Sequence, residues 1–197
     1  MKQVQIKHRW NGSVLFTAEI PDDTPSGLEM RVALEKATAA RANLAGAYLA
    51  GANLARANLA GAYLAGANLA GAYLADANLA RAKLEKATAA RANLAGANLA
   101  GANLAGAKWR NGIVISKAPV QVYGLHWTVT ILDAHMQIGC ELHSLADWSA
   151  YDDARINEMD GREALRFWRA HKDALLAMAR GAGRSFEPVV QPEAQDA

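Results

Sequence analysis

A five-residue period runs without insertion from Val32 to Gly106 and constrains this chain more than any other feature. The typical unit is Ala-Asn-Leu-Ala-Gly. Its centre is Leu at positions 34, 44, 49, 54, 59, 64, 69, 74, 79, 84, 94, 99 and 104 and Ala at 39 and 89, which makes fifteen units in phase. Ala stands two residues before the centre in every unit but the first. Gly or a charged residue stands two residues after it.

The period argues against both a helix and a disordered chain. In an α-helix, five steps of about 100° would move successive Leu residues about 140° around the axis, so no apolar stripe would form. Each Gly in a helix interior would also cost about 1 kcal/mol. Disorder is suggested by the low complexity, but an apolar residue at every fifth position provides regular surface that a fold can bury.

A solenoid satisfies the period. Each unit would form one short side of a coil, with Leu pointing inward, and the small Ala would let neighbouring sides approach. Gly would supply the corners, because it adopts the φ values needed there at little cost. Coils stacked about 4.8 Å apart would pair their backbone N–H and C=O groups with the coils above and below.

The repeat over residues 32–111 resembles the pentapeptide-repeat family, whose pattern is Ala-(Asn/Asp)-Leu-X-X. The resemblance implies a mainly β fold, a right-handed quadrilateral β-helix with four units in each coil. Residues twenty apart should therefore stack in columns. Two such columns can be written from the sequence: Asn58, Asn78 and Asn98 below Thr38, and Lys36, Arg56, Asp76 and Gly96.

The columns predict which outward-facing residues meet. Asp76 should lie over Arg56 and form an exposed ion pair worth at most about 1 kcal/mol. Tyr48, Tyr63 and Tyr73 fall on three different sides, so we do not expect an aromatic binding strip. The segment LEKATAARANLAGA begins at Leu34 and again at Leu84, and fifty residues is two and a half coils, so its two copies would face opposite sides.

Residues 1–31 are expected to form an N-terminal cap and a lead-in to the coils. Residues 3–9 and 13–19 alternate apolar and polar around Asn11-Gly12, which predicts a β-hairpin covering the first coil. A helical turn is expected over Leu28–Ala33. The first residues lack a secretory apolar core, and no run of about 18 apolar residues follows, so we expect a cytoplasmic protein without a membrane contact.

Residues 112–183 are expected to form a C-terminal cap of strands and helices. From Gly112 to about Cys140, β-branched and aromatic runs predict three or four strands that extend or plug the coil end. A first helix is predicted over 144–158 with Ser144 as its cap. A second is predicted over 161–180, opened by a capping box at Asp160 and ended by a Gly. Residues 184–197 are predicted to be a flexible tail.

The second helix carries an apolar stripe, which consists of Leu165, Trp168, Leu175 and Ala179 with Phe167 to one side. Such a stripe must be covered. It could pack on the solenoid or on a second copy of the chain. By analogy with gyrase-targeting relatives that dimerise through their C-terminal ends, we predict a homodimer through this helix.

One constellation of side chains deserves consideration as a chemical site: Asp133, His135, Cys140 and His143. These are ligand types that suit zinc, but their spacing matches no known zinc motif. A buried Cys beside surface His residues is the simpler interpretation. A Cys140 nucleophile with a His base has neither an oxyanion hole nor a cleft predicted near it. We therefore predict no catalytic residue, no metal, no cofactor and no enzyme activity.

Charge guides the choice of partner. The best-understood branch of the family mimics duplex DNA and occupies bacterial DNA gyrase, which requires an anionic surface. Residues 32–106 instead carry seven basic and three acidic residues, a net charge of +4. Residues 109–197 carry nine basic and twelve acidic residues, a net charge of −3, and their exposed acidic residues are expected at Asp147, Asp152, Asp153, Glu158 and Asp160.

We therefore expect a non-enzymatic scaffold or protein-interaction module whose partner is an unidentified protein. A modulator of bacterial DNA gyrase or topoisomerase is the alternative, and a zinc-binding or thiol enzyme through the C-terminal segment is a distant third. Direct nucleic-acid binding is disfavoured, because seven scattered basic residues make no stripe. Specificity should lie in the non-repetitive segments, since the repeat is nearly uniform.

Overall fold

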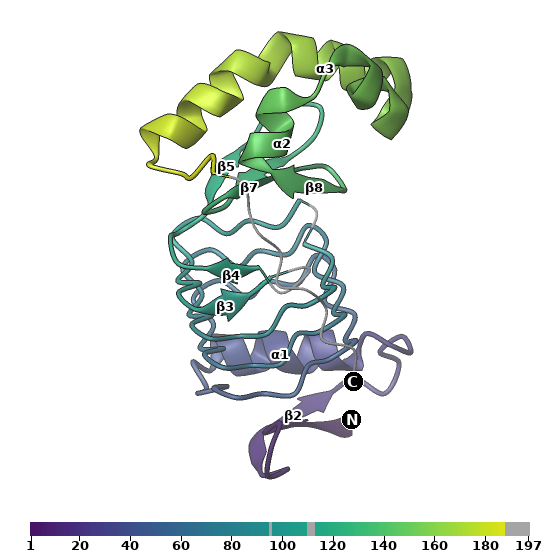
Figure 1. The fold of residues 1–197 in the computed structure, drawn as a ribbon. Helices are drawn as coiled ribbons and strands as arrows, with labels where there is room; N and C mark the ends of the chain where they lie inside the picture. The colour runs from purple at the N-terminus through teal and green to yellow at the C-terminus, as the bar shows by residue number, and fades with distance from the viewer. Residues whose placement is uncertain (95, 110–112, 188–197) are drawn as a thin grey trace, which may run out of the picture. The chain divides into compact units, whose positions relative to one another are not determined.

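The computed structural model describes residues 1–94, 96–109 and 113–187 (Figure 1). Contacts divide the chain into two compact units, Met1–Ala118 and Pro119–Ala197. The first unit therefore extends a few residues past the repeat, which was predicted to end at 111. Within the described residues, no helix combines the length and apolar character needed to cross a membrane.

Stacked coils make up most of the first unit. Parallel bridges join residues twenty apart, from Asn43 with Tyr63 to Thr88 with Lys108, so each coil contains four units, as the family resemblance implied. The backbone pairs in both directions along the stack: Leu64 N–H donates to Lys83 O at 2.8 Å, and Lys83 N–H donates to Ala62 O at 2.9 Å. The coils are thus joined by their main chains.

The interior of the coils is filled by the central Leu residues and the small Ala residues before them. Their relative exposure is 0 to 4% at Leu positions 44, 49, 54, 59, 64, 69, 74, 79, 84, 99 and 104. Leu94 is only half-buried. Because water is excluded from these side chains, each Leu contributes about 1.5–3 kcal/mol through burial.

Positive φ angles mark the corners, and Gly does not supply all of them. Gly51, for example, has φ +67°. The same conformation is adopted by six charged residues, with φ of 54–60°: Arg41, Arg56, Asp76, Arg81, Lys86 and Arg91. A left-handed conformation costs a residue with a Cβ about 1–2 kcal/mol.

At two of these six corners, Arg56 and Arg81, an Asn three residues earlier offsets part of that cost. Asn78 Oδ1 accepts a hydrogen bond from Ala80 N–H at 3.1 Å, just before the corner at Arg81. The same bond from the residue two positions later forms at Asn43, Asn53, Asn58, Asn68, Asn98 and Asn103. This Asx-type turn stabilises the bend locally, so the second position of the repeat is a turn residue.

The predicted columns form within the coils, but Thr38 and Lys36 do not join them. Asn78 Nδ2 donates to Asn58 Oδ1 at 3.4 Å, and Asn98 Nδ2 donates to Asn78 Oδ1 at 3.5 Å. Arg56 Nε lies 3.9 Å from Asp76 Oδ2, and both side chains are exposed. The ladder and the ion pair are therefore confirmed.

The first two units are helical, which corrects the predicted start of the β-helix at 32. Helix α1 spans Glu29–Ala39 (Figure 1). Thr38 Oγ1 donates to Leu34 O at 2.8 Å, and Lys36 Nζ donates to Glu19 O, so neither residue joins its column. These units lie at the end of the stack and contain strong helix formers without Gly, so helical hydrogen bonds satisfy their backbone.

The N-terminal hairpin is confirmed. Strand β1 (Lys2–Lys7) pairs antiparallel with β2 (Val14–Ile20), and Ile6 and Ile20 are fully buried. The hairpin contacts α1, and β1 continues onto a coil, since Tyr48 N–H donates to Lys7 O at 2.8 Å. At the other end of the unit, β3 (Ala107–Lys108) pairs with β4 (Val114–Ile115). Trp109 occupies the central position there and is 2% exposed.

The second unit is a four-stranded sheet with helices. Strands β5 (Val120–Val122), β6 (Val129–Ile131), β7 (His135–Ile138) and β8 (Glu141–Ser144) are antiparallel and adjacent in chain order. Helices α2 (Leu145–Ala150) and α3 (Asp153–Gly181) follow. The strands were predicted, but they continue past Cys140 to Ser144.

The predicted helix over 144–158 is wrong in its continuity. Ser144 caps α2 as expected, accepting from Asp147 N–H at 2.9 Å. The chain is then extended at Tyr151 and Asp152, and Asp152 caps α3. Non-helical dihedral angles at Asp160 and Gly161 (φ +63°) kink α3 where the second helix was predicted to begin.

The apolar stripe of α3 is covered within its own unit. Phe167, Trp168, Leu175, Leu176 and Ala179 are buried in one core with strand residues such as Met136. The stripe therefore no longer supports a homodimer through this helix, and the homodimer stays a prediction.

The predicted tail begins too early. Arg184 is 8% exposed, its Nη1 lies 3.2 Å from Asp133 Oδ1, and Phe186 packs against the core. The part of the predicted tail from 188 to 197 lies outside the described residues.

Leu74→Ala tests the buried interior of the coils. Leu74 is fully buried, so its truncation should lower the free energy of unfolding by about 2–5 kcal/mol. The matched control is its neighbour Tyr73→Ala, which removes a side chain that is 58% exposed and should cost no more than about 0.5 kcal/mol. Denaturant unfolding followed by circular dichroism measures both. Equal effects of the two changes would refute the inward assignment of Leu.

Gly51 tests the corner conformation without interference from packing, because a Cβ built there meets no atom within 4 Å. Gly51→Ala should lower the free energy of unfolding by about 1–2 kcal/mol, owing to φ alone. Gly51→Asn should cost less although Asn is larger, since Asn tolerates positive φ. The same denaturation experiment ranks the two variants. A larger loss for Asn than for Ala would contradict the assignment.

Candidate interaction sites

The coil surface presents separated side chains. Tyr48, Tyr63 and Tyr73 are 53%, 40% and 58% exposed and belong to different columns, so the aromatic strip is absent as predicted. Lys83 Nζ lies 4.5 Å from the Tyr63 ring centroid. This contact places one coil cation over an aromatic ring rather than in a basic stripe.

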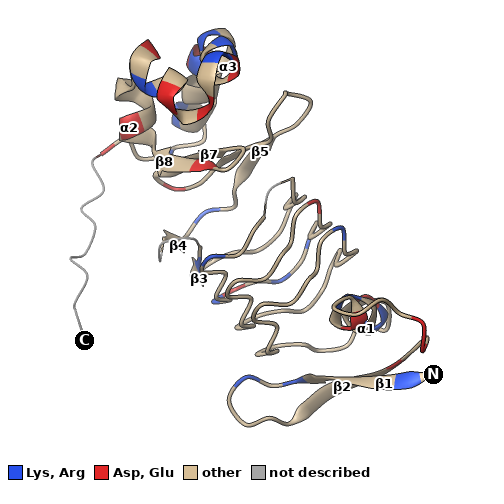
Figure 2. Ribbon diagram, turned by 90° about the vertical axis from the view of Figure 1, so that its right-hand side faces the viewer, with Lys and Arg blue, Asp and Glu red and all other residues tan. Residues whose placement is uncertain are grey.

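Charges on the coils are also scattered. Figure 2 shows isolated blue and red segments on the coils and a dense mixture of both signs on α3. By the twenty-residue period, Arg56, Lys86 and Arg91 occupy three different corners. The acidic Glu85 is engaged, since Asn103 Nδ2 donates to Glu85 Oε1 at 2.7 Å. No coil side therefore carries a continuous charge pattern in the part of the chain that the structure describes.

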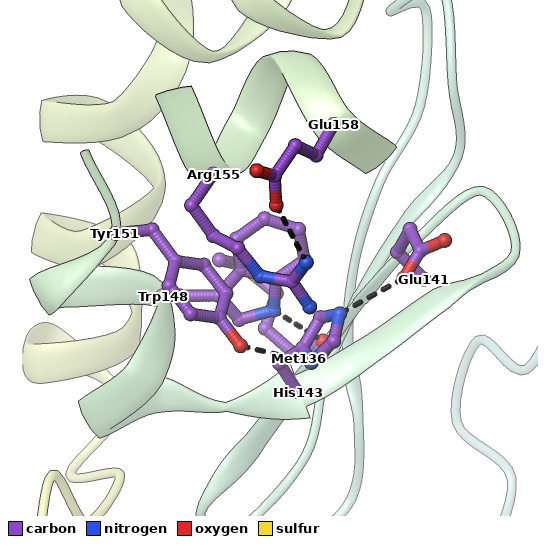
Figure 3. Close-up of polar contacts among 7 residues, drawn as sticks. All are labelled: Met136, Glu141, His143, Trp148, Tyr151, Arg155 and Glu158. Atoms are coloured by element: carbon purple, nitrogen blue, oxygen red, sulfur yellow. Dashed lines mark hydrogen bonds and ion pairs between the residues drawn. The ribbon is translucent and has the colours of Figure 1, made fainter. Parts of the chain in front are cut away.

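A chain of polar side chains lies at the junction of β8 and α2 (Figure 3). His143 Nε2 is 2.9 Å from Glu141 Oε2, and His143 Nδ1 is 3.0 Å from Tyr151 Oη. Glu141 and His143 are two residues apart on one strand, so they share a face. An ionised carboxylate only accepts, so in the neutral imidazole Nε2 carries the proton and the Tyr151 hydroxyl donates to Nδ1.

Aromatic packing fixes this polar chain. Trp148 Nε1 donates to Met136 O at 2.7 Å, and its ring centroid lies 5.2 Å from that of His143 and 5.7 Å from that of Tyr151 (Figure 3). Burial raises the pKa of Tyr151, and the negative charges of Asp147 and Glu141 add to this effect. Arg155 acts in the opposite direction and lowers the pKa. The phenol therefore stays protonated and serves as a donor that positions His143.

The residues proposed for a metal or thiol site have separate roles. Asp133 pairs with Arg184, His143 bonds to Glu141 and Tyr151, and Cys140 is exposed rather than buried. His135 is half-buried, and its Nδ1 has no hydrogen-bond partner among the described residues. Over residues 1–94, 96–109 and 113–187, no group of three His, Cys, Asp or Glu side chains could hold a metal ion.

The acidic residues expected to form an anionic surface are largely engaged in local contacts. Asp147 and Asp152 take part in the caps of α2 and α3. Asp153 pairs with Arg169, and Glu158 pairs with Arg155 at 3.2 Å. These basic partners offset much of the negative potential that mimicry of DNA would need.

An aromatic pocket of about 50 Å³ opens in the second unit. Trp127, Trp148, Phe167 and Trp168 contribute to its walls. The Trp127 and Phe167 ring centroids are 5.1 Å apart, and those of Trp148 and Trp168 are 5.0 Å apart. Glu141 and Asp160 supply its carboxylate-bearing residues.

Sequence reasoning missed both the pocket and the polar chain. The spacing of Glu141 and His143 could have indicated a shared strand face, had the strand been predicted beyond Cys140. The pocket had no comparable signal, because its rings come from a loop, α2 and α3 and meet only in the folded unit.

Comparison with known proteins finds similarity over the repeat. A family model described as pentapeptide repeats matches eight copies over residues 31–62, 42–79 and 72–111. The crystal structure of alr5209, a pentapeptide repeat protein from Nostoc Pcc 7120, is 34% identical over 43% of this chain and 73% of its own, with a TM-score of 0.23. No curated protein matches.

A second solved structure is HetL, a pentapeptide repeat protein involved in heterocyst differentiation regulation from the cyanobacterium Nostoc sp. strain PCC 7120. It is 32% identical over 34% of this chain and 40% of its own, with a TM-score of 0.20. TM-scores of this size do not indicate a shared overall structure, so the relationship rests on the repeat sequence. Pro119–Glu187 lies outside the residues that the family model matches.

His135 should make the second unit sensitive to acid. Burial lowers its pKa below the ordinary value of 6.5, although Asp147 opposes this. The unfolded chain therefore binds the proton more readily, and stability is lost as the pH falls through 6.5 toward the folded-state pKa. His135→Asn should lose less stability between pH 7 and pH 5 than the wild type, as measured by denaturant unfolding at each pH. An equal loss in both proteins would contradict the assignment.

Proposed function

The chain belongs to the pentapeptide-repeat family, and we propose that it is a non-enzymatic scaffold that binds a protein partner. Members of this family are generally non-enzymatic repeat scaffolds. The observation that carries the proposal is the filled interior of the coils. The central Leu side chains from 44 to 104 are 0 to 4% exposed, except Leu94, which is half-buried, and Ala89 replaces Leu at one central position. A filled rod offers outer surface to another macromolecule and no cleft to a substrate.

Family membership also supports finer proposals. The coil is right-handed and quadrilateral, and the hairpin β1–β2 and the strand β4 protect its two ends from edge-to-edge association. The protein works in the bacterial cytoplasm.

Specificity resides in the non-repetitive segments. Trp10 at the hairpin tip is 76% exposed, with the Arg9 guanidinium 5.0 Å from its ring centroid. Exposed Trp and Arg are the residue types most enriched at energetically important interface positions. The coils support this hairpin through the hydrogen bond that Tyr48 N–H donates to Lys7 O.

Modulation of DNA gyrase is the second candidate. The net charge of −3 over residues 109–197 favours it, while the ion pairs of Asp153 and Glu158 weaken it. Supercoiling by purified gyrase in the presence of equimolar full-length protein decides this candidate. Inhibition would favour the gyrase role over an unrelated protein partner.

Affinity capture from a bacterial lysate tests the scaffold proposal, using the full chain, Trp10→Ala and the control Tyr73→Ala. Tyr73 is 58% exposed on a coil and belongs to the repeat. We expect one protein to be retained in stoichiometric amount by the wild type and by Tyr73→Ala, and to be reduced at least tenfold by Trp10→Ala, since interface Trp residues contribute about 2 kcal/mol or more. The purified partner should then rebind in calorimetry. Failure of every version to retain a partner that rebinds would overturn the proposal.

A further inference from the structure

The aromatic pocket of the second unit has a charge bias. Glu141 and Asp160 contribute to its lining, and no Lys, Arg or His among the described residues does so. The faces of Trp rings carry negative electrostatic potential and attract cations. Trp168 illustrates this within the protein, since Lys172 Nζ lies 5.6 Å from its ring centroid. From this combination of rings and carboxylates, we propose that the pocket binds an organic cation with a methylated ammonium head group.

The size of the pocket suits such a head group. A volume of about 50 Å³ corresponds to about three to five water-sized groups at roughly 10–15 Å³ each. A trimethylammonium group, with its nitrogen and methyl carbons, is of this size. Larger aromatic or sugar ligands would not fit without movement of the Trp rings.

Desolvation favours a methylated ammonium over a guanidinium or a primary amine. A guanidinium has five N–H donors and a primary ammonium has three, and each donor needs an acceptor once water is removed. The rings of Trp127, Trp148 and Phe167 carry no acceptor oxygens, which leaves only the side chains of Glu141 and Asp160 in the lining to accept such bonds. A methylated head group has no N–H to satisfy, so it enters an apolar cage at a smaller cost.

The backbone of α3 shapes the pocket. Gly161 has φ +63° and ψ −152°, a combination that is essentially restricted to Gly. Met159 before the kink, Asp160 within it and Ala164 after it all line the pocket. An uninterrupted helix would place these residues differently, so the kink brings the acidic residue Asp160 to the pocket lining. The buried core around Trp168 does not require that charge.

Calorimetric titration of the full chain with choline chloride tests the proposal, at constant ionic strength. We expect saturable binding in the millimolar range or tighter. The neutral isostere 3,3-dimethylbutan-1-ol has the same shape without the charge and should bind at least about tenfold more weakly. Equal binding of the two compounds, or no choline binding up to about 100 mM, would overturn the proposal.

Two substitutions in the pocket lining and one control outside it locate the site. Asp160→Asn keeps the shape and removes the charge, so it should weaken choline binding about two- to fivefold. Asp173→Asn makes the same charge change at an exposed position of α3 outside the pocket lining and should leave it unchanged. Trp127→Leu removes a ring that is only partly buried and should weaken binding at least tenfold, with the fold checked by circular dichroism. Equal affinities for all three variants would refute the site.

The source of the head group is distinguished by one further titration. Nα-acetyl-trimethyllysine amide presents the same head group on a side chain. Tighter binding than choline indicates a modified protein partner, and weaker binding indicates a free small molecule; both agree with the proposed chemistry. The titrations need no protein partner, so they can fail while the scaffold proposal stands, and the reverse also holds.

Discussion

Hydrogen bonding between coils twenty residues apart is the interaction on which the first unit depends. Pairing of this kind satisfies the backbone only if every unit has the same length, which explains the absence of insertions from Asn43 to Gly106. It also places every central side chain in one narrow interior, where Leu fits and larger residues are confined to the end, as Trp109 is. The uniform repeat is therefore a consequence of backbone geometry rather than of a binding surface.

The same constraint separates what the sequence could predict from what it could not. The period and the inward-facing Leu followed from spacing, whereas the columns and the Arg56–Asp76 pair followed from the four units per coil that the family resemblance implied. The first turn of α1 was predicted over Leu28–Ala33, but its extension to Ala39 was not, because the segment LEKATAARANLAGA occurs twice and its two copies differ in structure. Leu34–Ala39 is helical at the end of the stack, whereas Leu84 and Ala89 lie in coils that pair on both sides. Context, through available backbone partners, decides between the two conformations.

Prediction was weaker in the second unit because its organisation is not periodic. Strand and cap signals such as Ser144 were local and proved correct. The break at Tyr151–Asp152 and the extent of β8 depend on tertiary contacts, including the bond from Trp148 Nε1 to Met136 O. The pocket draws residues from Trp127 to Trp168, and the polar chain joins Glu141 to Tyr151. Neither arrangement leaves a recognisable spacing in the sequence, so both had to be seen in three dimensions.

The dependence of the fold on coil pairing is tested most directly by backbone carbon chemical shifts of the duplicated segment. The two copies have the same local sequence, so intrinsic propensity contributes equally to both. We predict helical secondary shifts for Leu34–Ala39 and non-helical shifts, with positive φ at Lys86, for Leu84–Ala89. Identical shifts in the two copies would contradict the account, because the conformation would then be set by the segment itself and not by the coils around it.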